Sequence, residues 1–117
     1  MHELSIVQSV VQSVTEWLQT QPPVRVKTVT LRVGALSAVV EDALQFGYGV
    51  ATEGTPLDGT TLVVHSLPIV VYCPQCQELR ELPGTQAFVC PACGAPAGDV
   101  RQGREIEIES LEIEDEE

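Results

Sequence analysis

The sequence predicts an α/β (α+β) protein in which a small sheet of about three main strands packs with two helices and carries an inserted subdomain. Three observations predict this class. Apolar residues recur at helical spacing in two early segments, apolar and polar residues alternate in three other segments, and two Cys-x-x-Cys motifs lie between the second and third of those strands. The chain of 117 residues suits one domain with a small satellite unit.

The first predicted element is a helix from Glu3 to about Gln19. Glutamine and serine residues lie opposite its apolar stripe, which is the pattern of an amphipathic helix on a core. Pro22 and Pro23 end the helix because proline has no amide hydrogen to continue it. The stripe consists of Leu4, Val7, Val11, Val14 and Leu18.

A strand is predicted over residues 24–33, where apolar and polar residues alternate, and Gly34 closes it. A second helix is predicted within residues 36–54. Ser37 is a suitable cap for its start, and acidic residues suit its first turn, where they favour the helix dipole. Gly47 and Gly49 each cost about 1 kcal/mol in a helix interior, and we interpret them as a close approach to a sheet.

The other main strands are predicted near residues 60–67 and 104–114, and a short apolar run at 69–72 leads into the cysteines. The segment between the last two strands therefore interrupts the main fold. We expect two domains: an α/β domain of residues 1–68 with 101–117, and an inserted domain of residues 69–100.

The net charge of −11 argues against binding to the phosphate backbone of nucleic acids or to an anionic membrane surface. Many of the acids lie in residues 105–117, which we interpret as a solvated strand face and tail. No run of 18 apolar residues and no signal-peptide pattern is present, so we expect a cytoplasmic protein.

The cysteines form two knuckles. Cys73-Pro74-Gln75-Cys76 is followed by thirteen residues and then by a second motif that begins at Cys90 and ends at Cys93. Two such turns supply four thiolates in a tetrahedron, which is the geometry of a closed structural zinc site. Few large apolar residues lie between the motifs, so the unit needs a metal to fold. We therefore predict a zinc-ribbon subdomain.

Two other interpretations of the cysteines are open. A pair of redox dithiols fits less well, because neither motif starts a helix after a strand as in thioredoxin. The spacing does not exclude an iron–sulfur cluster.

The N-terminus also offers metal ligands. A residue as large as His2 should block removal of the initiator, so Met1 should keep its free amine. That amine, the backbone nitrogen and imidazole of His2, and a backbone nitrogen or carboxylate of Glu3 form a nitrogen-rich set that favours Ni(II) or Cu(II). From these residues alone an uninvolved, exposed histidine is the simpler interpretation. The immediate helix start and the metal site elsewhere favour the metal.

Four stretches together resemble the hydrogenase nickel-incorporation protein family, HypA/HybF. They are MHELSIVQSVV, LRVGALS, the paired cysteine motifs and QGREIEIESLEIE, and they span essentially the whole chain in order. The chain departs from the family at Ala35, where glutamate is common. No metal role is assigned to that position.

The resemblance implies a nickel metallochaperone with nickel at the Met1 amine, His2 and Glu3, and structural zinc at the four cysteines. It also implies two partners: a nickel-handling maturation GTPase of the HypB type and the large-subunit precursor of [NiFe]-hydrogenase. Glu41 and Asp42 are candidates for a further nickel carboxylate, whereas His65 fits a strand residue better than a ligand.

The sequence shows no phosphate loop, nucleophile–base pair or open zinc site, so we expect a protein that is not an enzyme. One rival function is a zinc-ribbon interaction or nucleic-acid-binding protein, which the acidic charge opposes. The other is a thiol oxidoreductase.

Overall fold

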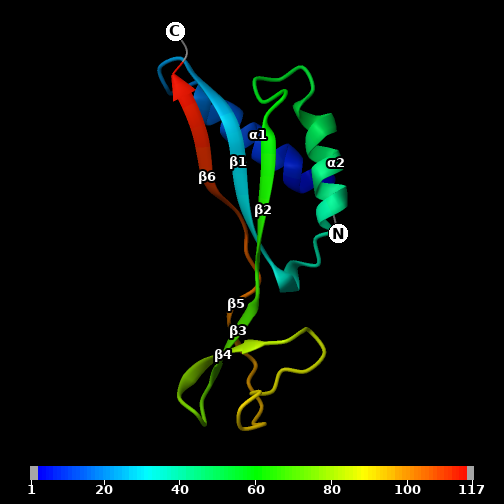
Figure 1. Cartoon of the computed structure of the whole chain (residues 1–117), viewed down its shortest axis with the longest axis vertical. Coiled ribbons are helices and arrows are strands. Elements are labelled where there is room, and N and C mark those ends of the chain that lie inside the picture. The colour runs from blue at the N-terminus through cyan, green and yellow to red at the C-terminus, as the bar shows by residue number, and fades with distance from the viewer. Residues whose placement is uncertain (1–2, 116–117) are drawn as a thin grey trace. The chain divides into compact units, whose positions relative to one another are not determined.

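Figure 1 shows the computed structural model of the chain, which describes residues 3–115. It divides into two compact units. The helical unit comprises the described residues of Met1–Leu31, Val39–Val64 and Ile108–Glu117, and the cysteine unit comprises Arg32–Ala38 and His65–Glu107. No helix of the described residues is long and apolar enough to cross a bilayer.

Two α-helices and six strands among residues 3–115 confirm the predicted α+β class. In chain order they are α1 (Glu3–Leu18), β1 (Val24–Gly34), the short 3-10 helix η1 (Ala35–Ser37), α2 (Glu41–Thr52), β2 (Thr61–Leu67), β3 (Ile69–Cys73), β4 (Glu78–Leu82), β5 (Asp99–Gln102) and β6 (Ile106–Asp115). The strands form two sheets of three, in the orders β2-β1-β6 and β4-β3-β5. The three predicted main strands are therefore neighbours in one sheet.

The core of the helical unit is mostly aliphatic. Val7 and Val14 of α1 are buried, as the predicted stripe requires, but Leu4 of the same stripe is 52% exposed. Each fully buried residue of this size contributes about 1.5–3 kcal/mol of transfer free energy. The other buried members include Val10, Val26, Val29, Leu31, Leu44, Tyr48, Leu57 and Leu62.

The start of α2 differs from the prediction. Ser37 lies in η1 and its hydroxyl donates to the carbonyl of Gly34 at 2.7 Å, so it does not cap α2. Ala38 then adopts a φ of 58°, which ends the first turn. The residue before α2 is Val40, whose own side chain supplies no cap.

The glycine in the middle of α2 has a different role from the one predicted. A Cβ on Gly47 would lie 3.4 Å from Val7 Cγ2 and 3.9 Å from the Cα of Leu4. The close approach at Gly47 is therefore to helix α1 and not to a sheet.

The cysteine unit has its own small core. β3 pairs antiparallel with β4, and the pairs Ile69–Leu82 and Cys73–Glu78 define the register. Alternate residues of β3 are buried, so one face of the strand turns inward. The core consists of Ile69, Val71, Leu82 and Ala97, with Leu36, Phe88 and Val100 packed against it.

Two glycines in the cysteine unit bring separate backbones together. A Cβ on Gly34 would collide with the carbonyl group of Gly103. Hydrogen bonds join the same segments: the amide of Gly34 donates to the carbonyl of Glu105 at 2.7 Å, and that of Leu36 to Gly103 at 2.8 Å. Gly103 itself has a φ of 130°, where a side chain is disfavoured.

Candidate metal centres

The two cysteine motifs fold into matching turns. In each, the residue after the second cysteine donates its amide to the carbonyl of the first cysteine: Gln77 to Cys73 at 2.7 Å, and Gly94 to Cys90 at 2.8 Å. Both donors have positive φ, 56° for Gln77 and 75° for Gly94. The turn also directs the amide of Cys76 to the sulfur of Cys73 at 3.4 Å. This local geometry aims both sulfurs of a motif to one side.

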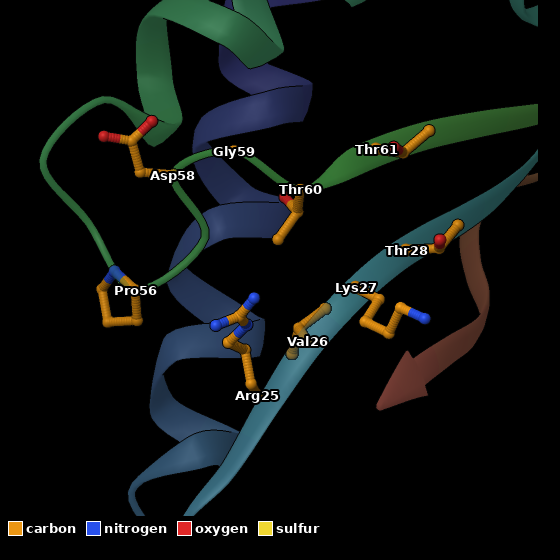
Figure 2. Close-up of a pocket in the computed structure, with 9 residues that line it drawn as sticks. All are labelled: Arg25, Val26, Lys27, Thr28, Pro56, Asp58, Gly59, Thr60 and Thr61. Atoms are coloured by element: carbon orange, nitrogen blue, oxygen red, sulfur yellow. The ribbon is translucent and has the colours of Figure 1, made fainter. Parts of the chain in front are cut away.

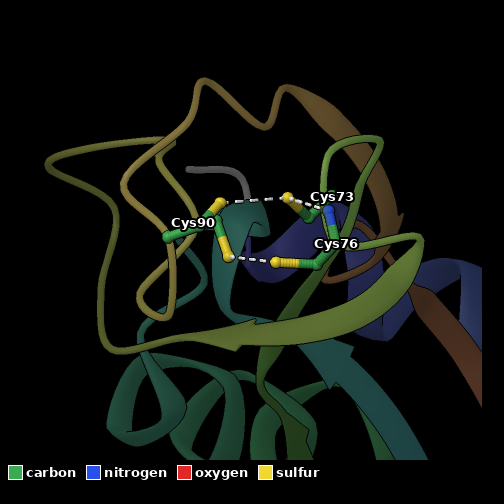
Figure 3. A group of neighbouring side chains, drawn as sticks. Cys73, Cys76 and Cys90 are labelled. Atoms are coloured by element: carbon green, nitrogen blue, oxygen red, sulfur yellow. Dashed lines mark hydrogen bonds between the residues drawn. The ribbon is translucent and has the colours of Figure 1, made fainter.

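The four sulfurs converge. Sγ of Cys73 lies 3.6 Å from that of Cys93, Sγ of Cys76 lies 3.9 Å from that of Cys90, and all four lie within 4.8 Å of one another. Figure 3 shows Cys73, Cys76 and Cys90 pointing toward one another from the two turns. Cys73 and Cys90 are buried, whereas Cys93 is exposed.

These distances fit one tetrahedral ion. Zinc–sulfur bonds of about 2.3 Å put neighbouring sulfurs about 3.8 Å apart, whereas a disulfide needs about 2.05 Å. The neighbouring sulfurs come from different motifs, unlike a redox dithiol, in which the two thiols belong to one motif. A cluster of several irons would spread its ligands further than a single ion does. The donor set therefore fits zinc best.

The thiols of Cys90 and Cys93 differ in pKa. The backbone amide of Cys93, helped by that of Ala92, lowers the pKa of Cys90 to about 6. The backbone at Ala95 acts to lower the pKa of Cys93, but burial and the other three sulfurs raise it to about 12. Cys90 thus ionises readily, and its negative charge disfavours ionisation of Cys93. A dication is what stabilises all four as thiolates.

One residue near this centre is not anticipated by the sequence analysis. Cys76, Cys90 and Glu78 raise the pKa of Arg80, on β4, above its usual range, and Nη2 of Arg80 lies 2.7 Å from Oε2 of Glu78. A lone basic residue just after the first motif is the only signal in the sequence, and it does not indicate a position near the sulfurs.

Of the three residues predicted to bind nickel, the structure describes Glu3, because Met1 and His2 lie outside the described residues. Glu3 begins α1, and its Oε2 accepts a hydrogen bond from the amide of Val40 at 2.9 Å. The candidates Glu41 and Asp42 follow directly and are exposed in the first turn of α2. The structure thus ties Glu3 to the segment that carries both carboxylates.

His65 and a hollow beside β1 are separate from the predicted metal ligands. His65 is an exposed residue of β2. Figure 2 shows a hollow of about 550 Å³ between β1 and the loop that precedes β2. Two of its charged residues have structural partners: Arg25 pairs with Glu114 at 3.5 Å, and Asp58 accepts the amide of Gly54 at 3.1 Å. No predicted metal ligand lines it.

Comparison with known proteins decides the family. The family model described as "Hydrogenase/urease nickel incorporation, metallochaperone, hypA" matches residues 1–113. The chain belongs to the HypA family. The resemblance seen in the sequence is thereby confirmed. Because members of the HypA family are metallochaperones and maturation factors, the expectation that the chain is not an enzyme is confirmed as well.

Relatives and solved HypA structures agree. The hydrogenase maturation factor HypA of Chloroflexus aurantiacus is 42% identical over 112 residues, which cover 96% of this chain and 98% of the relative. That of Roseiflexus sp. is 45% identical over 115 residues, 98% and 94% of the two chains. The solution structure of the Ni metallochaperone HypA from Helicobacter pylori superposes with a TM-score of 0.68 at 21% identity, covering 99% of this chain and 100% of that one. This structural similarity confirms the fold.

Proposed function

We propose that this chain is a nickel metallochaperone that binds Ni(II) at its N-terminus and delivers it for the maturation of [NiFe]-hydrogenase. One observation carries the proposal: the nickel-incorporation family model matches from residue 1 and therefore includes the Met1-His2-Glu3 sequence. The proposed ligands are the Met1 amine, the backbone nitrogen and imidazole of His2, and Glu3. A nitrogen-rich set of this kind favours Ni(II) over Zn(II).

The structure supports the backbone nitrogen of Glu3, rather than its carboxylate, as the ligand. The carboxylate is engaged by the amide of Val40 at 2.9 Å. A carboxylate needed by the ion could come instead from Glu41 or Asp42, which begin α2 directly after Val40. In this arrangement the side chain of Glu3 joins the start of α1 to the start of α2, while its main chain binds the metal.

The second part of the proposal is a structural zinc ion bound by Cys73, Cys76, Cys90 and Cys93. With four protein ligands the ion has no open position for substrate or water. Its role is to hold the two turns together in a unit whose core has few large residues. The inserted domain is proposed to be residues 69–100, and the nickel-binding domain 1–68 with 101–117.

The proposed partners follow from the family. They are a nickel-handling GTPase of the HypB type and the large-subunit precursor of [NiFe]-hydrogenase, both met in the cytoplasm. The net charge of −11 opposes nucleic acid and anionic membranes as partners. Binding to single-stranded nucleic acid in a low-salt filter assay would instead support the rival zinc-ribbon function.

Nickel titration of four forms of the zinc-loaded chain tests the proposal. They are the native chain with Met1 verified by mass spectrometry, a form with an N-terminal extension, His2→Gln, and His65→Gln as the matched control. We expect one nickel per native chain and unchanged affinity in His65→Gln. The extension removes the free amine and His2→Gln removes the imidazole, so each should weaken binding at least tenfold, about 1.4 kcal/mol. Native affinity in both altered forms would place nickel elsewhere.

Delivery needs a separate measurement. The nickel-loaded chain is mixed with the purified large-subunit precursor in the presence of a chelator that captures free nickel. Nickel recovered on the precursor from the native chain, and not from His2→Gln, is the expected result. Transfer that is equal for free nickel and for the loaded chain would contradict a chaperone role.

A further inference from the structure

Strand β6 lies at an edge of its sheet. The order β2-β1-β6 places β1 on one side of it and no strand of the described residues on the other, and Figure 1 shows β6 on the side of the sheet away from α2. The opposite edge is partly covered, because Gln45 of α2 donates its side-chain amide to the carbonyl of Leu62 in β2 at 2.8 Å. An uncovered edge presents unpaired N–H and C=O groups that can bind another strand.

Apolar surface flanks the edge of β6 within the helical unit. A hollow of about 230 Å³ is lined by Ser13, Val14 and Trp17 of α1 and by Ile108 and Leu111 of β6. Trp17 is 36% exposed and Ile108 is 37% exposed, and Ile113, further along the strand, is 42% exposed. When a strand is added to a sheet, hollows beside the edge receive its alternate side chains.

The opposite face of β6 is acidic, and the strand already pairs with a basic one. Oε1 of Glu112 accepts the hydroxyl of Thr28 at 3.0 Å, and Oε1 of Glu114 lies 3.5 Å from Nε of Arg25. The residue numbers of these pairs run in opposite directions, so β6 is antiparallel to β1. Strand β1 begins Val-Arg-Val-Lys and therefore alternates apolar with basic residues.

Acidic charge is in excess along this part of the sheet. Residues 108–115 of β6 contain four acids, whereas residues 24–31 of β1 contain two bases. Pairing β6 with β6 of a second copy would bring the acids of both strands together, and like charges on adjacent strands are destabilising. The charge therefore opposes a second copy and favours a basic strand.

We propose that the edge of β6 binds an extended segment of a partner protein in which apolar residues alternate with Lys or Arg. The backbone of that segment pairs with β6, its apolar side chains lie against Trp17 and Ile108, and its basic side chains lie near Glu112 and Glu114. None of the proposed metal ligands belongs to this surface.

Fluorescence anisotropy with a labelled peptide of sequence VRVKTVTLRV tests this binding. The peptide repeats residues 24–33, the sequence that β6 accepts on its paired side. In the full chain, Ile113→Lys places a cation among the apolar residues of the edge and should weaken peptide binding about tenfold or more. Val50→Lys is the matched control and should bind like wild type, because Val50 is half-exposed on α2 of the same unit and the change in charge is the same.

A second peptide, VEVETVTLEV, tests the charge pattern. It keeps the apolar residues and replaces each base by glutamate, so it should bind the wild-type chain at least tenfold more weakly than the basic peptide. Glu112→Lys should weaken binding of the basic peptide for the same reason. Equal binding of the two peptides by wild type would overturn the requirement for a basic partner.

Hydrogen exchange locates the bound peptide. The basic peptide should slow exchange of amides within residues 108–115 and leave those of α2 unchanged, because strand addition satisfies the edge amides of β6. Equal peptide affinity in Ile113→Lys and Val50→Lys, or no binding to wild type at millimolar peptide, would overturn the proposal. A wild-type dimer in sedimentation that Ile113→Lys abolishes would also overturn it, by assigning the edge to a second copy.

Discussion

Glu3 connects two segments that are distant in sequence. Its carboxylate accepts the amide of Val40, the residue before α2, at a helix start that has no side-chain cap of its own. A negative charge at a helix N-terminus is favourable by about 0.3–1 kcal/mol on an exposed surface. One side chain thus helps to order both the beginning of α1 and the beginning of α2.

We predict that Glu3→Gln separates the structural role of this residue from its metal role. The change should lower the free energy of unfolding by about 0.3–1 kcal/mol, because the charge at the start of α2 is lost. Nickel affinity should fall far less than in His2→Gln, because the backbone nitrogen is retained. Urea unfolding and nickel titration measure the two effects. An equal loss of nickel affinity in Glu3→Gln and His2→Gln would indicate that the carboxylate of Glu3 is a nickel ligand.

The buried Tyr48 should make the free energy of unfolding depend on pH in the alkaline range. Burial raises its pKa above the ordinary value of about 10, although a 2.6 Å hydrogen bond with Thr60 acts in the opposite direction. A raised pKa favours the protonated form in the folded state, so its stabilisation is complete below about pH 10 and is lost as pH rises through the folded value. Unfolding free energies at pH 8–11 should show this loss in wild type and a smaller loss in Tyr48→Phe. The same pH dependence in wild type and in Tyr48→Phe would contradict this role of Tyr48.

At the scale of elements, we expect the inserted unit of residues 69–100 to depend on a metal for its folding. We predict that Cys90→Ser lowers zinc content and speeds hydrogen exchange over residues 69–100, because the small core around Ile69 and Val71 does not hold the turns alone. The α1 and α2 amides should keep their protection, since their buried residues belong to the helical unit. Full zinc content with unchanged exchange in this variant would exclude a structural role for the site.

The backbone at Gly34 packs closely against the backbone at Gly103, and this close approach leads to another prediction. Gly34→Ala should lower the free energy of unfolding by about 2 kcal/mol or more, because the added carbon collides with the Gly103 carbonyl. Gly49→Ala is the control: a Cβ there meets nothing within 4 Å, so it should be neutral or stabilise α2 by up to about 1 kcal/mol. Equal stability of the two variants would show that the segments separate at little cost.

Across the whole molecule, regular patterns were readable from the sequence and contacts between distant residues were not. The strands near 24–33, 60–67 and 104–114 and the helix from Glu3 follow from periodicity, and four cysteines in two motifs are sufficient to predict a shared ion. The sequence predicts too early a start for α2 because Ser37 is a suitable cap, whereas in the structure Ala38 has a φ of 58° and turns the chain before α2 begins. The hydrogen bond between Glu3 and Val40 depends on tertiary packing.

We propose that nickel binds at a nitrogen-rich N-terminal site and not at a carboxylate cluster. Isothermal titration of the zinc-loaded native chain from pH 6 to pH 8, in buffers of different ionisation heat, tests it most directly. Imidazole and a terminal amine protonate near about 6.5 and about 7.7–8.0, and protons compete with nickel for the same lone pairs. We expect nickel binding to release protons, and nickel affinity to fall with decreasing pH while zinc stays bound. Flat affinity with no proton release would contradict it and assign nickel to carboxylates.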